Sequence, residues 1–190
     1  MRDRRRRSRP GIVGKDDRRR ALGQQMAEQP HLGCVIILDR VVVIHVIAAE
    51  IGEGPGCQTH AIEAVRYIKQ GMDPAPMTTC GLSNVSNQVP EQQRSLLNRV
   101  YLVMLMATGL DTAIADPLDA ALMDTIRIVE ERDESTPGGA LLVRLYDRVA
   151  SAEEVEPSDV DMSEPEQVDI CKTVQVLLNK TIYTDSYLRG

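Results

Sequence analysis

Residues 78–119 read TTCGLSNVSNQVPEQQRSLLNRVYLVMLMATGLDTAIADPLD, and this stretch decides the predicted fold. A short strand is expected over 77–80, followed by the polar loop 81–87. Residues 96–108 are apolar almost all round and end at a glycine, which is typical of a well-buried helix. A second short strand is expected over 112–115. A strand, a covering helix and a second strand in this order are typical of an α/β protein with a parallel sheet.

The same succession of elements precedes and follows this stretch. Residues 34–38, CVIIL, form an apolar run that stops at Asp39, as expected of a strand buried on both faces. Apolar residues share one face of a helix predicted over 59–70. After the last strand, Asp116 is the expected N-cap of a further helix and Pro117 its first residue. Three strand–loop–helix units predict a parallel sheet with its working loops at the carboxyl ends of the strands.

Two segments depart from this succession. Residues 1–17 are predicted to form a disordered basic arm, because they are rich in arginine and show no apolar periodicity. Residues 135–169 contain three prolines and an acidic stretch, and we expect them to be a solvent-facing insertion around a short helix at 140–150. Helical spacing resumes over 174–187 and predicts a closing helix.

The charge balance argues against a nucleic-acid-binding protein. The chain has 190 residues and a net charge of -6, whereas nucleic-acid-binding domains are usually basic. The charge is uneven: ten basic and three acidic residues give +7 over residues 1–20, and 12 basic and 25 acidic residues give -13 over residues 21–190. The chain has five Tyr and no Phe or Trp, so it is poor in the aromatic platforms that stack on single-stranded nucleic acid.

The four cysteines predict no metal site. They form no CxxC pair and no zinc-binding pattern with histidine, so no bound metal is expected. The longest apolar run, residues 34–49, is too short and too charged to span a bilayer. The basic first residues lack the apolar segment of a signal peptide. The expected compartment is therefore the cytoplasm, where thiols stay reduced.

The loop 81–87 holds the side chains best suited to chemistry. Gly81 permits a close backbone approach, and Ser83 offers a hydroxyl group. Asn84 and Asn87 each offer both donors and acceptors. A neutral amide can donate to a ring nitrogen or accept from its protonated form. The alternative interpretation is that Asn84 and the serines cap the following turn.

With GLSNVS, LLNR and GLDTAIADP in this order, residues 78–119 resemble the methyltetrahydrofolate:corrinoid protein methyltransferases. These enzymes are pterin-binding relatives of dihydropteroate synthase and of the folate module of cobalamin-dependent methionine synthase. The sequence VLLNKTIYTDSYL, residues 176–188, is similar to the closing helix of that family. The resemblance is weaker over residues 18–70.

The resemblance implies an α/β fold, namely a TIM (β/α)8-type pterin-binding barrel. A complete barrel needs about 250 residues, so residues 18–190 would form an N-terminally truncated portion with the last three strand–helix units. The family usually has a proline after the position of Asp39 and a second one further on, where this chain has Arg40 and His45. An open piece of barrel exposes a sheet edge, so we expect a homo-oligomer or a partner chain.

The resemblance also implies an activity, the transfer of the methyl group of 5-methyltetrahydrofolate to the Co(I) corrinoid (a cobalamin) of a partner protein. The pterin would bind in the barrel mouth, and Asn84, which matches the asparagine of the GLSN motif, would be the catalytic residue. Asp39 matches the family aspartate that accepts hydrogen bonds from the amino-pyrimidinone edge of the pterin. The pterin-binding residues that the resemblance implies are Asp39, Gly81, Ser83, Asn84, Asn87 and Arg94.

Two other functions stay open at this point. A fragment that has lost catalysis would bind pterin weakly or only with a partner chain. A dihydropteroate-synthase-like enzyme is the second alternative, although that reaction needs a lysine where this sequence has Asn84. Simpler interpretations also exist for Asp39, as a strand-end turn carboxylate, and for Asp116, as a helix cap.

Overall fold

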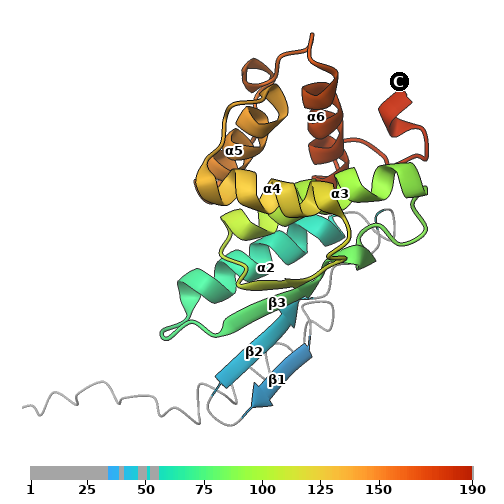
Figure 1. Ribbon diagram of the computed structural model, residues 1–190. Helices are drawn as coiled ribbons and strands as arrows, with labels where there is room; N and C mark the ends of the chain where they lie inside the picture. Colours follow the sequence, from blue (N-terminus) through green and yellow to red (C-terminus); the bar gives the residue numbers. More distant parts are fainter. Residues whose placement is uncertain (1–33, 39–40, 47–50, 52–55, 190) are drawn as a thin grey trace, which may run out of the picture. The chain divides into compact units, whose positions relative to one another are not determined.

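The computed structural model describes residues 34–38, 41–46, 51 and 56–189, which form one sheet and a layer of helices (Figure 1). The strands are β1 (Cys34–Leu38), β2 (Val41–Val46), β3 (Met77–Gly81) and β4 (Thr112–Ile114). The α-helices are α2 (Cys57–Gly71), α3 (Glu91–Ala107), α4 (Ala120–Glu131), α5 (Pro137–Ala150) and α6 (Pro165–Leu177). Short 3-10 helices are η2 (Leu82–Asn84), η3 (Pro157–Asp159) and η4 (Tyr187–Arg189). Within these residues, no helix has the length and apolar character needed to cross a membrane.

The sheet has the strand order β1-β2-β3-β4, with β1 at one edge and β4 at the other. Strands β2, β3 and β4 run parallel, with Val46 level with Cys80 and Cys80 level with Ala113. Strand β1 runs antiparallel to β2, with Leu38 opposite Val41. The structure confirms three parallel strands, but our choice of the first one was wrong, because β2 and not β1 is parallel to β3.

Strand β2 was missing from the prediction because residues 34–49 read as one apolar run interrupted by charge. Its sequence, VVVIHV, is mostly β-branched and favours a strand. Adjacent antiparallel strands need only a short connection, so two strands fit where the sequence predicted one. The chain therefore enters the parallel part of the sheet with β2, which precedes α2.

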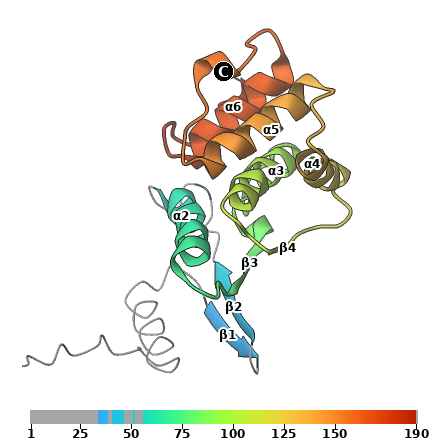
Figure 2. The ribbon, with the colours of Figure 1, turned by 90° about the vertical axis from the view of Figure 1, so that its left-hand side faces the viewer.

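Helix α3 is the central helix of the layer. It contacts α2, α4, α5, α6 and η2 (Figure 2). The prediction of a well-buried helix is confirmed, because Leu97, Val100, Val103 and Leu105 are fully buried. Burial of a side chain of this size contributes about 1.5–3 kcal/mol to stability. The helix begins earlier than predicted, with Glu91 in its first turn, where a carboxylate interacts favourably with the helix dipole.

The segment 135–169 does not face solvent throughout, so that part of the prediction was wrong. Helix α5 contacts α3, α4 and α6, and its Leu141 and Leu145 are each 1% exposed. Pro137 occupies the first turn of α5, where proline is favoured, so it begins the helix instead of marking a loop. An amphipathic helix in this segment therefore completes the core.

The start of α4 also differs from the prediction. Its N-cap is Asp119, whose carboxylate accepts a hydrogen bond from the backbone N–H of Leu122 at 3.0 Å. The predicted cap, Asp116, accepts from the backbone N–H of Leu118 at 2.9 Å in the preceding turn. The Asp119 carboxylate also accepts from the Ser95 hydroxyl of α3 at 3.0 Å, and this tertiary contact favours the later start.

The predicted closing helix over 174–187 was wrong beyond its first residues. Helix α6 ends at Leu177, and Asn179 then adopts a φ of 55°. Asparagine tolerates this left-handed conformation, which ends many helices. The backbone N–H of Lys180 donates to the carbonyl of Gln175 at 2.8 Å and closes the turn.

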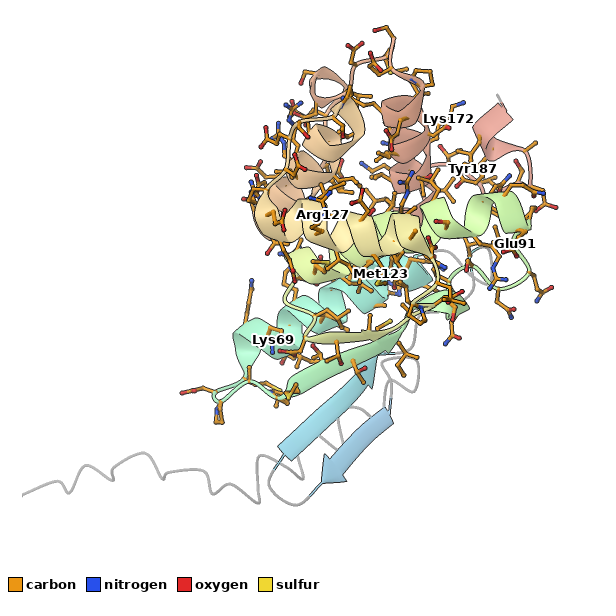
Figure 3. The ribbon with its side chains drawn as sticks, viewed as in Figure 1. Lys69, Glu91, Met123, Arg127, Lys172 and Tyr187 are labelled. Carbon is orange, nitrogen blue, oxygen red and sulfur yellow. The ribbon has the colours of Figure 1, made fainter. Side chains whose placement is uncertain are left out.

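A hydrogen-bond network ties the amino ends of β3 and β4 to α2. The Asp111 carboxylate accepts from the backbone N–H of Thr78 at 2.7 Å and from its hydroxyl at 2.8 Å. The ammonium group of Lys69 donates to the same carboxylate at 2.8 Å and to the carbonyl of Pro76 at 3.2 Å (Figure 3). Burial alone would raise the pKa of Asp111, but the hydrogen bonds from Lys69 and Thr78 outweigh it and hold the pKa below its ordinary value. The polar residues at the amino ends of these strands therefore stabilise the fold.

Candidate functional site

The loop after β3 is shaped by buried residues that alternate with exposed ones. Leu82 and Val85 are fully buried and anchor the loop, whereas Ser83 and Asn84 are exposed. The backbone N–H of Val85 donates to the carbonyl of Leu82 at 3.2 Å, which closes the turn of η2. Helix η2 contacts α3 and β4. The loop therefore lies at the carboxyl end of the parallel strands, as predicted.

Asn84 presents its amide at the surface of this loop. Its backbone carbonyl accepts from the N–H of Asn87 at 3.2 Å, which fixes the main chain. Within the described residues, the Asn84 side chain caps no turn and makes no hydrogen bond. Both its donor and its acceptor are therefore available to a ligand.

The capping interpretation applies to Ser86 instead. This residue is fully buried, and its hydroxyl donates to the carbonyl of Ser83 at 3.2 Å. The side chains of Ser83 and Asn87 are exposed on the same loop as Asn84. The loop thus brings three of the predicted site residues together and uses the fourth polar residue to hold its shape.

Gly81 and Arg94, two further predicted site residues, do not present a free polar side chain on the loop. Gly81 has φ -81° and ψ 92°, an ordinary extended conformation that does not require glycine. Arg94 lies in the first turns of α3, and its guanidinium group is 3.3 Å from the Glu91 carboxylate. Its Nε is buried and has no partner among the described residues. Arg94 therefore stands on the helix that follows the loop, with one side of its guanidinium engaged by Glu91.

Asp39 lies outside the described residues. Leu38 before it and Val41 after it pair with each other where β2 begins. The loop 82–87 follows the other end of the parallel strands, and a strand the length of β2 spans about 17 Å at about 3.3 Å per residue. The described strands therefore do not bring the flanks of Asp39 to the Asn84 loop, and the pterin role of Asp39 stays a prediction.

The sequence favoured structural roles for Asn98 and Arg99 on α3 and assigned no role to Tyr101. The hydroxyl of Tyr101, Asn98 Oδ1 and Arg99 Nε are buried without a hydrogen-bond partner in the part of the chain that the structure describes. Burial raises the pKa of Tyr101, with smaller contributions from Cys80 and Cys57. An unpaired buried polar atom costs about 1–3 kcal/mol. The signal in the sequence was the placing of polar residues inside an otherwise apolar helix.

The ionisable side chains near the loop do not form a metal site. Among the described residues there is no group of three or more His, Cys, Asp or Glu side chains that could hold a metal ion. Cys57, Cys80 and Cys171 form no disulfide within the part of the chain that the structure describes. The polar groups of the loop are amides and hydroxyls, which recognise a ligand by hydrogen bonding.

Comparison with known proteins relates this chain to part of a much larger enzyme. No family model matches the chain. Over 113 residues, which are 60% of this chain, it is 33% identical to the methionine synthase of Mycobacterium leprae (strain TN). The matched part is 8% of that enzyme, so the chain spans a small fraction of the length of this relative. The match agrees with the part of the sequence resemblance that named methionine synthases.

Proposed function

We propose that this chain is the C-terminal portion of a TIM (β/α)8-type pterin-binding barrel and serves methyl transfer from 5-methyltetrahydrofolate to the Co(I) corrinoid of a partner protein. The exposed amide of Asn84 at the carboxyl end of β3 is the observation that carries this proposal. The likeness to a methionine synthase over 60% of the chain supports it. So does the sequence of the Asn84 loop, in which the GLSN motif stands at the end of a parallel strand.

Asn84 is suited to the difficult part of this reaction. The methyl group leaves a tertiary ring nitrogen, which keeps the bonding electron pair and must be protonated or strongly hydrogen-bonded to leave. The Asn84 amide can donate to the neutral nitrogen and can accept from the protonated one. It therefore interacts with the pterin through the whole change of charge. The Co(I) corrinoid, when bound to its partner protein, would supply the electron pair for the new bond to the methyl carbon.

The other exposed side chains of the loop would hold the ring in place. Ser83 and Asn87 provide a hydroxyl and an amide beside Asn84, and fixed hydrogen bonds of this kind orient a reactant for displacement. Arg94 provides a cation in the first turns of α3, the helix that follows the loop. The resemblance assigns the amino-pyrimidinone edge to Asp39, but the described strands do not bring its flanks to this loop, so the proposal does not depend on Asp39.

A second candidate function is binding of pterin without turnover, or with a partner chain only. No described strand covers the outer edge of β4, and Ile114 on it is exposed. Both observations favour this candidate, because a complete barrel has no open edge. The strands of a whole barrel would supply further pterin contacts, so we expect weak binding and little turnover by this chain alone.

Methyl transfer to free cob(I)alamin distinguishes the two candidates. Under anaerobic conditions, the purified chain and 5-methyltetrahydrofolate should slowly consume the Co(I) absorption. The Asn84→Ala variant should abolish this change, and Gln92→Ala should preserve it, because Gln92 is an exposed amide on α3 outside the loop. Pterin binding without any loss of Co(I) absorption would favour the non-catalytic candidate. Equal rates for wild type and Asn84→Ala would contradict the role of Asn84.

A further inference from the structure

Asp116 follows β4 at the same end of the sheet as the Asn84 loop. Strands β3 and β4 run parallel beside each other, and Gly81 and Ile114 form the last pair of their register (Figure 2). Ser83 and Asp116 each stand two residues beyond this pair. Neighbouring strands lie about 4.7–4.9 Å apart, so the two segments leave the sheet beside each other. Helix η2 also contacts β4, which makes Asp116 a neighbour of the loop.

The carboxylate of Asp116 is held by its turn and only half used. Its Oδ1 accepts from the backbone N–H of Leu118 at 2.9 Å. The residue is exposed, and its Oδ2 has no hydrogen-bond or ion-pair partner within the described residues. Residues 100–126 contain no lysine or arginine that could neutralise it. The turn therefore limits the direction of this carboxylate and leaves one oxygen available to a donor.

Helix α4 does not need Asp116 as its cap. Asp119 occupies the N-cap position, where its carboxylate accepts from the backbone N–H of Leu122 at 3.0 Å. The same carboxylate accepts from the Ser95 hydroxyl at 3.0 Å and so joins α4 to α3. Two acidic residues of one short segment thus have different roles. Asp119 satisfies the helix, and the second oxygen of Asp116 has no structural partner among the described residues.

We propose that Asp116 is a further pterin-binding residue, whose carboxylate accepts hydrogen bonds from the amino-pyrimidinone edge of 5-methyltetrahydrofolate. That edge has two adjacent donors, a ring N–H and the exocyclic amino group, which match the two oxygens of a carboxylate. Each carboxylate oxygen has two lone pairs, so Oδ1 can accept from Leu118 and from the ligand together. This inference rests on the proposed function and names a residue that orients its substrate.

The two neighbouring strand ends suit the two ends of one bicyclic ring. The nitrogen that bears the methyl group belongs to one ring and contacts Asn84, and the amino-pyrimidinone edge belongs to the other ring and contacts Asp116. The negative charge of Asp116 also repels the glutamate carboxylates at the far end of the ligand, which favours this orientation. The Glu91 carboxylate on α3 is a weaker candidate, because it already lies 3.3 Å from the Arg94 guanidinium group.

Calorimetric titration of the Asp116→Asn variant with 5-methyltetrahydrofolate tests the contact. The amide oxygen can still accept from the N–H of Leu118, but the amide nitrogen replaces an acceptor with a donor. The dissociation constant should rise by about tenfold or more. Asp161→Asn is the matched control, since Asp161 is exposed and accepts from the backbone N–H of Ser163 at 2.9 Å in the same kind of turn. It should bind like wild type.

An altered ligand distinguishes a direct contact from a structural effect. In the 2-desamino-2-methyl analogue of 5-methyltetrahydrofolate, a methyl group replaces the exocyclic amino donor. Asp116→Asn should weaken binding of this analogue by a smaller factor than it weakens binding of 5-methyltetrahydrofolate. A loss of the same factor for both ligands would overturn the proposed contact, because a distorted loop would affect both equally.

The outcomes separate this inference from the proposed function. Weaker binding by Asn84→Ala with unchanged binding by Asp116→Asn would overturn the role of Asp116 and leave the proposed function standing. No heat from a wild type that unfolds cooperatively would overturn both. Thermal melts should show Asp116→Asn and Asp161→Asn folded like wild type. Should Asp116→Asn fail to fold, Asp116→Ser takes its place, because a serine hydroxyl can also accept in such a turn.

Discussion

The amino and carboxyl ends of β3 and β4 use polar residues in opposite ways. At the amino end, Asp111, Thr78 and Lys69 satisfy one another in a closed network of hydrogen bonds. At the carboxyl end, the side chains of Ser83 and Asn84 are exposed and make no hydrogen bond within the described residues. The polar groups at one end stabilise the fold, and those at the other end are available to bind.

This difference matches a general property of sheets built from parallel strand–helix units. The loops after the carboxyl ends carry function, and the opposite end contributes to stability. The contrast predicts that substitutions at the amino end lower the free energy of unfolding, whereas substitutions of exposed loop residues leave it nearly unchanged. The next four predictions test it, from the largest effect to the smallest.

Asp111→Ala should lower the free energy of unfolding by about 1.5–3 kcal/mol, the usual contribution of hydrogen bonds to a charged group. It leaves the hydroxyl of Thr78 and the ammonium group of Lys69 without their acceptor. Urea unfolding followed by circular dichroism measures the change. Asn84→Ala is the matched control at the other end of β3 and should lie within about 0.5 kcal/mol of wild type. A larger loss of stability for Asn84→Ala than for Asp111→Ala would contradict the difference between the two ends of the strands.

The contribution of Asp111 should also depend on pH. Its pKa in the folded chain is lowered from 3.8, so its stabilisation is fully present above that ordinary value and is lost as the pH falls through the folded pKa. The stability difference between wild type and Asp111→Asn should therefore stay constant near neutral pH and shrink below about pH 4. Urea midpoints over this range give the measurement. A difference that grows on acidification would have the wrong sign.

The two candidate caps of α4 should differ in effect. Asp119→Ala should cost about 1 kcal/mol, as is usual for loss of an N-cap side chain. Asp116→Ala should cost less, because Asp116 accepts one hydrogen bond in an exposed turn. Thermal unfolding of the two variants in one buffer compares them directly. A larger loss for Asp116→Ala would show that the predicted earlier start of the helix was correct.

The smallest effect is expected at Gly81. Because its φ is -81°, an alanine can adopt the same backbone conformation, and Gly81→Ala should change the unfolding free energy by less than about 0.5 kcal/mol. Gly109→Ala provides the contrast, since Gly109 has a φ of 98° that alanine rarely adopts. Chemical unfolding of both variants tests the difference. A larger loss of unfolding free energy for Gly81→Ala than for Gly109→Ala would mean that the loop needs a glycine for another reason.

Much of the strand and helix pattern near the site could be predicted from sequence. The strands at 77–80 and 112–115 and the buried helix between them follow from local apolar patterning, and the structure contains all three. The polar loop was identified for the same reason, since its residues interrupt apolar segments on both sides. Local patterns were sufficient wherever one element fills one segment of the sequence.

The remaining features depend on contacts between distant residues. Asp119 is preferred over Asp116 as a cap, and Asp119 also binds the Ser95 hydroxyl of α3, which no local pattern reveals. The burial of α5 depends on its packing against α3 and α6. In contrast, the end of α6 had a local signal, because Asn179 favours the left-handed conformation that it adopts.

The most direct test of a pterin site at the carboxyl end of the strands is calorimetric titration of the chain with 5-methyltetrahydrofolate. We predict a measurable heat of binding for wild type and for Gln92→Ala. We predict binding weaker by about 1–3 kcal/mol for Asn84→Ala, because the substitution leaves a polar group of the ligand unpaired. Asn84→Ala must unfold at the same urea midpoint as wild type for the comparison to hold. No heat from a chain that unfolds cooperatively, or equal affinity for wild type and Asn84→Ala, would contradict the account.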